Sequence, residues 1–244
     1  MISLPLRPEI IQAACDGVYL LDRGYPKESV INFVANHFVL LKEERNLIYR
    51  GICASKTAKN TKKKVLTSLD SNFLSKINSV GIDGFNLLIT YETILKGEPV
   101  IYCYDSLIRD ISAIHRKYKQ TQWTSEGIES ICDVLHRNLS ENIINIYLDQ
   151  VISKSGQIAA HIRDNLKKKK INGEVFCCKS PDHEVLKNDL IISHDSWVVQ
   201  NAQHILDLPY ILLKESKIIN TPQIVNLREE IRQYWQRIQD NIFQ

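Results

Sequence analysis

The sequence predicts an α/β fold with a mainly parallel central sheet, preceded by a small all-helical unit and followed by a C-terminal amphipathic helix. Between residues 78 and 215, short apolar segments alternate with longer segments of helical periodicity, as in βαβ units. The segment from Ile143 to Leu148 is apolar at almost every position, which is typical of a strand covered on both faces in a parallel sheet. The predicted order is a helical appendage at 1–54, a basic linker at 55–77, the α/β domain at 78–215 and a C-terminal helix at 216–244.

Composition limits the classes of protein that this chain can belong to. A chain of 244 residues with 44% hydrophobic content is long enough to bury a full core. Its formal net charge of +3 is far from the strongly basic balance of proteins that coat nucleic acid, so any nucleic-acid contact must be local. No apolar run reaches the roughly 18 to 20 residues that cross a bilayer, and the N-terminus lacks the apolar region of a signal peptide. We therefore expect a cytoplasmic protein without membrane contact, whose cysteines form no C-x-x-C pair and stay reduced.

The N-terminal unit is predicted from three apolar stripes of helical spacing, which begin near Pro8, Ser29 and Lys42. Three short helices resemble a helix-turn-helix on spacing alone, although packing against the chain's own domain is the more common role of such an appendage. The lysine-rich segment from Ser55 to Leu66 has few apolar residues and predicts a solvated linker. The alternative is an arm that attracts a polyanion.

Acidic residues follow the predicted strands. The segment SVGID ends at Asp83, VIYCYD at Asp105, IINIYLD at Asp149 and DLIISHD at Asp195. The carboxyl ends of parallel strands lie along one edge of a sheet, where carboxylates that converge raise each other's pKa unless a cation lies between them. Mg²⁺ or Mn²⁺, which prefer oxygen ligands, are the expected cofactors.

The sequence contains, in this order, the motif IDGFN, an internal strand ending in Asp, and the motifs SPDHE and IISHDS. This order resembles the PIN-like nuclease superfamily, and within it the NYN-type branch. The resemblance covers roughly residues 78 to 215. It implies a three-layer α/β/α domain in which a cluster of carboxylates holds one or two metal ions for the hydrolysis of RNA. The resemblance assigns the catalytic and metal-binding roles to Asp83, Asp149, Asp182 and Asp195.

This chain also departs from the family pattern. His194 stands where the family more often has a small polar residue, and the second acidic position is either Asp105 or Asp149. Asp182 begins a predicted helix after Pro181, with Glu184 as the reserve ligand.

Residues beside the carboxylates have two interpretations each. Asn86 either caps the following helix or holds the Asp83 carboxylate, and Gly84 lets the backbone turn tightly next to a ligand. We predict a helix over residues 104–118. On it, Asp105 is either an N-cap paired with Arg109 at i, i+4, or a further metal ligand with Arg109 on a bound phosphate. The predicted substrate-binding residues are Asn86, Arg109, Ser193 and Lys154.

The C-terminal part of the chain predicts three further features. Trp197 lies just inside a helix and either stacks a base or packs against the sheet. Residues 205–213 predict a closing strand, with Pro209 marking a sheet edge. Thr221 and Pro222 predict the start of the last helix, whose apolar stripe needs either this domain or a second copy of the chain as its partner, so a homodimer through this helix is a hypothesis.

The predicted function is therefore a divalent-metal-dependent nuclease, with RNA expected over DNA from the family resemblance. The alternative is a non-catalytic scaffold of the same fold that binds nucleic acid or a protein partner. A third hypothesis is an enzyme acting on a small phosphoester, because acids at strand ends also serve phosphatases.

Overall fold

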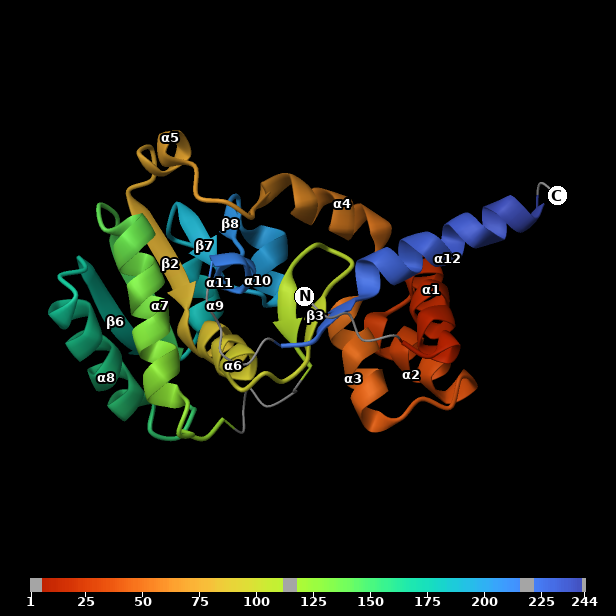
Figure 1. Ribbon diagram of the computed structural model, residues 1–244, viewed down its shortest axis with the longest axis horizontal. Helices are drawn as coiled ribbons and strands as arrows, with labels where there is room; N and C mark the ends of the chain where they lie inside the picture. The colour runs from red at the N-terminus through yellow and green to blue at the C-terminus, as the bar shows by residue number, and fades with distance from the viewer. Residues whose placement is uncertain (1–5, 112–117, 216–221, 243–244) are drawn as a thin grey trace. The chain divides into compact units, whose positions relative to one another are not determined.

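The computed structural model describes residues 6–111, 118–215 and 222–242. The chain divides into two units, the first comprising Met1–Lys63, Glu98–Ala113 and Pro222–Gln244, and the second comprising Lys64–Gly97 and Ile114–Thr221. Each unit is built from segments that are discontinuous in the sequence. Figure 1 shows the elements of both.

The second unit is an α/β domain around a six-stranded sheet of order β1-β8-β7-β2-β5-β6, in which all neighbouring strands are parallel. Its described elements are β1 (Val65–Leu66), α5 (Ser71–Leu74), β2 (Ser79–Asp83), α6 (Gly84–Leu95), α7 (Thr124–Leu139), β5 (Ile143–Asp149), α8 (Ser155–Lys168), β6 (Gly173–Cys178), α9 (Pro181–Val185), β7 (Leu190–Ile192), α10 (Ser196–Asn201), β8 (Ile205–Leu206) and α11 (Leu208–Glu215).

Helices cover both faces of this sheet, which confirms the predicted three-layer α/β/α fold. Helices α6, α7 and α8 lie next to one another on one face (Figure 1), and α11 packs against α6. The short helix α9 contacts β2 and β5 on the other face, with α10 beside it. Strand β2 lies between β5 and β7, and all of its residues after Ser79 are buried because helices enclose it from both sides.

The first unit joins the N-terminal helices to a small three-stranded sheet of order β4-β3-β9. One apolar core contains Val18 and Ile48 from the N-terminal helices, Ile101 from the sheet, and Leu227 and Ile231 from the last helix. The described elements are α1 (Pro8–Asp22), α2 (Lys27–His37), α3 (Lys42–Gly51), α4 (Ser55–Lys64), β3 (Val100–Tyr102), β4 (Ile108–Asp110), β9 (Ile224–Asn226) and α12 (Leu227–Ile242). The N-terminal helices thus pack within their own unit. This packing is the more common role that we expected for a three-helix appendage.

The C-terminal helix α12 is present and amphipathic, but it begins later than predicted. Residues 224–226 form a strand instead, and the side chain of Asn226 accepts a hydrogen bond from the backbone N–H of Glu229 at 3.1 Å, so Asn226 caps the helix. Leu227 and Ile231 are covered by the core of their own unit. A homodimer through this helix stays a prediction. Leu227 and Ile231 do not need a second copy of the chain to cover them.

Three further segments differ from the prediction. Residues 205–213 are not a strand: after the short β8, the Asp207 carboxylate accepts a hydrogen bond from the backbone N–H of Tyr210 and starts α11, with Pro209 in its first turn. The lysine-rich segment is not an irregular linker but the helix α4, because lysine favours helix and Ala58 and Thr61, three residues apart, supply a narrow buried stripe.

The predicted helix over 104–118 is also wrong where it can be compared. Ile108–Asp110 is a strand that pairs antiparallel with β3, and residues 112–117 lie outside the described part. Strand β3 in turn belongs to the small sheet of the first unit and not to the six-stranded sheet. The buried side chains of Leu107 and Ile108 favour the hairpin over an exposed helix.

Among the described residues, no helix combines the length and the hydrophobicity that crossing a membrane would need.

Candidate active site

The candidate site lies where the strand order of the six-stranded sheet reverses. The chain passes from β2 to β5 and β6 on one side, and then returns to β7 on the other side of β2. In open parallel sheets, ligands bind in the crevice that such a reversal leaves at the carboxyl ends of the strands. Asp83 ends β2, and the Ser193–Asp195 segment follows directly after β7, so both lie at this crevice.

Asp83 is the centre of the site. Its side chain is only 3% exposed, because it points from the end of β2 into the start of α6. Oδ1 accepts a hydrogen bond from the backbone N–H of Asn86 at 3.4 Å, and Oδ2 accepts one from the hydroxyl of Ser193 at 3.0 Å. A carboxylate is therefore fixed between two strands whose residues are more than a hundred positions apart.

Asn86 connects the same two strands. Its side-chain oxygen accepts a hydrogen bond from the backbone N–H of His194 at 2.9 Å, while its backbone N–H holds Asp83. The side chain of Asp83, and not that of Asn86, therefore caps α6, and the Asn86 side chain fixes the segment after β7. Ser193, which was expected to bind substrate, also makes contacts within the protein. Its hydroxyl donates to Asp83 and accepts from the backbone N–H of Asp195 at 3.2 Å.

Asp195 caps the helix α10. Its Oδ1 accepts hydrogen bonds from the backbone N–H groups of Trp197 at 2.8 Å and Val198 at 3.1 Å. Its Oδ2 accepts none from the described residues. One oxygen of this carboxylate is therefore held by the protein while the other remains available to a ligand.

The electrostatics of the site centre on Asp83. Burial, together with the carboxylates of Asp182 and Asp195, raises the pKa of Asp83 from 3.8 to about 7, against the opposing effect of the Ser193 hydrogen bond. Asp182 lies in the first turn of α9, after the edge strand β6. The carboxylates of Asp182 and Asp195 thus lie close enough to Asp83 to act on its charge.

Asp149 and Lys154 lie at the end of the neighbouring strand. Asp149 is two residues beyond Tyr147, the residue paired in register with Asp83, and it accepts a hydrogen bond from the backbone N–H of Val151 at 2.9 Å. Lys154 is exposed and adopts a left-handed backbone conformation directly before α8. Asp149 is at the carboxyl edge of the sheet, as predicted, and Lys154 lies five residues after it.

Asp105 and Arg109 lie in the first unit. They occupy the β3–β4 hairpin, where the guanidinium of Arg109 donates to both oxygens of Asp105, at 2.8 and 2.7 Å. Both side chains are buried, so the pair satisfies itself inside the protein. The interpretation that Asp105 pairs with Arg109 is confirmed, although the two residues lie on a hairpin and not on a helix. This ion pair occupies Arg109, so it is not available to a phosphate.

Sequence reasoning missed a buried pair behind the site. The imidazole Nε2 of His194 lies 3.3 Å from Oδ1 of Asp207, and both side chains are fully buried. Because Asp207 also starts α11, the pair ties the segment after β7 to that helix. The sequence signal was the Asp-Leu-Pro triplet at 207–209, which is a helix start.

Two exposed aromatic side chains lie beside the carboxylates. The indole of Trp197 is 44% exposed, and its ring meets the imidazole of His183 edge-on, with 4.6 Å between the ring centroids. Trp197 follows Asp195 by two residues and His183 follows Asp182 directly. The indole therefore does not pack fully against the sheet, and it presents a flat surface next to the acidic residues.

The chemistry of the donor set fits a hard divalent cation. Among the described residues, no three His, Cys, Asp or Glu side chains form a ready cage for a metal ion. Mg²⁺, however, keeps several waters and uses one or two carboxylates, so a closed cage is not needed. Asp83, Asp182 and Asp195 supply such oxygens, and a cation among them would offset the mutual repulsion that raises the pKa of Asp83.

Comparison with known proteins finds similarity to families and to a relative whose descriptions assign no function. The model of a domain of unknown function, DUF5616, matches residues 74–211, and the model of a protein of unknown function, DUF434, matches residues 9–64. The uncharacterized protein MJ0935 of Methanocaldococcus jannaschii is 37% identical over 202 residues, which cover 82% of this chain and 94% of that protein. No solved structure matches the chain significantly.

Proposed function

Because this chain belongs to the DUF5616 family, whose function is unknown, its activity has to be argued from the site, and we propose that it is a divalent-metal-dependent nuclease. The observation that carries the proposal is the buried Asp83 at the strand-order reversal, with a pKa raised to about 7 by burial and by Asp182 and Asp195. A buried carboxylate kept beside two others costs stability unless a cation joins them, and such sites are a mark of function.

Each residue has a defined task in this proposal. One or two of the carboxylates of Asp83, Asp182 and Asp195 would bind Mg²⁺ or Mn²⁺ directly and the others through its waters, with Asp149 at the same sheet edge as a further oxygen donor. When bound, such an ion stabilises the negative charge of a phosphodiester and lowers the pKa of a water molecule. The Ser193 hydroxyl keeps the carboxylate of Asp83 in one orientation. Lys154, exposed at the same edge, would contact the backbone of the substrate.

The substrate class follows from the aromatic surface. Trp197 and His183 present exposed rings next to the carboxylates, and an unpaired base can stack on such a surface whereas a base inside a duplex cannot. We therefore propose single-stranded RNA as the substrate, with RNA over DNA resting on the resemblance to the PIN-like nucleases. We expect the protein in the cytoplasm, where its six free cysteines stay reduced.

The test combines metal binding with hydrolysis. Calorimetric titration with Mn²⁺ compares the parent protein with Asp83→Asn/Asp195→Asn, and Asp164→Asn on the exposed face of α8 serves as the control for loss of charge. Asparagine is as good an N-cap as aspartate, so the variants keep both helix starts and should remain folded by circular dichroism. We expect binding in the parent and in the control, no binding in the double variant, and cleavage of a single-stranded RNA that EDTA abolishes.

Other outcomes would point to the other functions. Turnover of an aryl phosphate without cleavage of oligonucleotides would favour an enzyme for small phosphoesters. Binding of RNA that survives the double substitution, without turnover under any metal, would favour a scaffold.

A further inference from the structure

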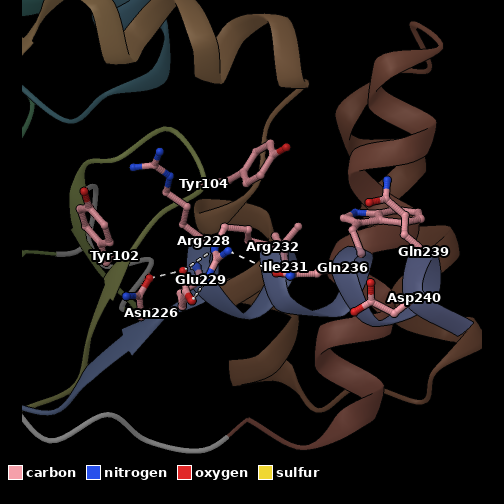
Figure 2. Close-up of a pocket in the computed structure, with 11 residues that line it drawn as sticks. Tyr102, Tyr104, Asn226, Arg228, Glu229, Ile231, Arg232, Gln236, Gln239 and Asp240 are labelled. Carbon is pink, nitrogen blue, oxygen red and sulfur yellow. Dashed lines mark hydrogen bonds and ion pairs between the residues drawn. The ribbon is translucent and has the colours of Figure 1, made fainter.

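The first unit contains a groove that the proposed nuclease site does not use. The groove has a volume of about 700 Å³ and lies between the β3–β4 hairpin and helix α12 (Figure 2). Tyr102 and Tyr104 line it from the hairpin side, and Arg228 and Trp235 line it from the helix. Its size is that of a site for a small organic ligand or for a short segment of a polymer.

Arg228 is the unusual side chain of this groove. Its guanidinium donates one hydrogen bond, from Nη1 to the hydroxyl of Ser106 at 2.8 Å. It forms no ion pair with any described carboxylate. The next arginine along the helix, Arg232, is different, because two of its nitrogens bind the carboxylate of Glu229 at 2.9 and 2.5 Å. No described carboxylate therefore lies within ion-pair distance of this half-buried guanidinium, although its charge acts on the neighbouring carboxylate of Glu229.

The position of Arg228 does not serve the helix that carries it. It is the second residue of α12, where the positive end of the helix dipole disfavours a cation. Its hydrogen-bond partner Ser106 has a left-handed backbone with φ of 72°, in the turn of the hairpin where its backbone N–H donates to the carbonyl oxygen of Cys103 at 2.9 Å. The cation in the first turn of α12 is thus a local cost, and the side chain extends from the helix toward the hairpin (Figure 2). A ligand with negative charge would offset this cost.

The rest of the lining suits a nucleotide. Tyr102, Tyr104 and Trp235 offer aromatic faces for stacking, and Gln236 and Gln239 offer amide donors and acceptors along the same groove. A guanidinium fork suits the paired oxygens of a phosphate better than an ammonium does. An acidic peptide would use the guanidinium, but it would leave the aromatic faces without a matching flat partner.

We propose that this groove binds one strand of nucleic acid, with a backbone phosphate on Arg228 and a base stacked on the aromatic residues. Glu229 is neutralised by Arg232, and Asp240 also lines the groove, so only about one phosphate contact is electrostatically strong. Binding should therefore weaken only slightly with salt, with a slope near −0.7 in a plot of log affinity against log salt, as for one phosphate of a single strand. The inference does not depend on the nuclease activity, because binding here needs neither metal nor hydrolysis.

The test uses the full chain with Asp83→Asn, in EDTA, so that no RNA is cleaved. The probe is a fluorescein-labelled single-stranded RNA of eight mixed nucleotides, followed by fluorescence anisotropy. We compare Arg228→Gln and Arg228→Lys with Arg237→Gln, a control that removes an exposed arginine of the same helix outside the groove. Thermal unfolding of each variant checks that loss of the Ser106 hydrogen bond leaves the protein folded.

We expect Arg228→Gln to weaken binding about tenfold and to flatten the salt slope toward zero, Arg228→Lys to weaken it less, and Arg237→Gln to change it less than twofold. In a protein with Trp123→Phe and Trp197→Phe, RNA should quench the remaining fluorescence of Trp235. The proposal is overturned if the parent does not bind the RNA, if Arg228→Gln and Arg237→Gln behave alike, or if a duplex or a poly-glutamate peptide binds more tightly than the single strand. Failure of RNA cleavage with this binding intact would remove the nuclease proposal alone.

Discussion

The hydroxyl of Ser193 donates a hydrogen bond to Oδ2 of Asp83 across 3.0 Å, and this bond joins the ends of β7 and β2 inside the second unit. It stabilises the charged form of a carboxylate whose surroundings otherwise favour the protonated form. Without a cation, the charged carboxylate of Asp83 therefore lowers the stability of the folded protein, and this effect can be measured directly.

The first prediction concerns the pH dependence of stability. Because the pKa of Asp83 is about 7 in the folded protein and near 3.8 when unfolded, the folded state retains a proton that the unfolded state has lost between these values. The free energy of unfolding should thus fall as pH rises from about 4 to about 7, by at most roughly 4 kcal/mol at about 1.4 kcal/mol for each pKa unit. Asp83→Asn should remove this fall and stabilise the protein at pH 8. Urea denaturation in EDTA at several pH values measures it, and a variant whose profile parallels that of the parent would contradict it.

The second prediction concerns Trp197. Loss of base stacking costs about 1 to 3 kcal/mol, so Trp197→Ala should raise the KM for single-stranded RNA by about tenfold and leave kcat nearly unchanged. The backbone N–H that holds Asp195 is unaffected by this substitution. Trp197→Phe should restore most of the affinity, whereas Trp197→Leu, which is apolar but not aromatic, should not. Steady-state kinetics separates these variants. A leucine variant that equals the phenylalanine variant would assign the residue to packing.

The third prediction separates Asp105 from the metal site. Asp105→Asn leaves the buried guanidinium of Arg109 without its counter-ion, which should destabilise the protein by about 3 to 5 kcal/mol. Replacing both partners by apolar residues, as in Asp105→Leu/Arg109→Met, should be less harmful because no charge stays buried. Neither change should alter the affinity for Mn²⁺ in the folded protein. A folded Asp105→Asn variant that no longer binds Mn²⁺ would return Asp105 to the list of metal ligands.

The fourth prediction concerns Gly84. A Cβ atom at this position would lie 2.5 Å from Cδ2 of Leu148 and 3.2 Å from the carbonyl oxygen of Tyr147, because the start of α6 packs closely on β5. Gly84→Ala should therefore destabilise the protein by about 1 to 3 kcal/mol. Gly156→Ala is the matched control, since nothing lies within 4 Å of the added methyl group, and it should be neutral or slightly stabilising. Thermal unfolding compares the two, and equal effects would exclude the packing explanation.

The sequence predicted the α/β class and the positions of Asp83 and Asp195 because both depend on local signals. A buried strand, an acidic residue and a helix start follow one another within a few residues in each case. Gly84 was also recognised as a special position, and the structure adds close packing on β5 as a reason for it.

The remaining features depend on contacts between distant residues. VIYCYD has the pattern of a core strand, but its partner is Ile224–Asn226, more than a hundred residues away, and this pairing places it in the other unit. The spacing of Asp105 and Arg109 suits a helix and a hairpin equally, and only the pairing of β3 with β4 decides between them. Which of the predicted carboxylates act on Asp83 depends on β7 lying beside β2, a pairing of segments more than a hundred residues apart.

The division of the first unit has a consequence for the order of events during synthesis. Its N-terminal helices leave the ribosome early, but their core includes Leu227 and Ile231, and the third strand of its sheet is β9. The apolar surface of these helices therefore stays incompletely covered while the roughly 170 residues between α3 and β9 are translated, a period in which exposed apolar surface favours chaperone binding or aggregation. The unit that begins at the N-terminus is completed only when the C-terminal helix arrives.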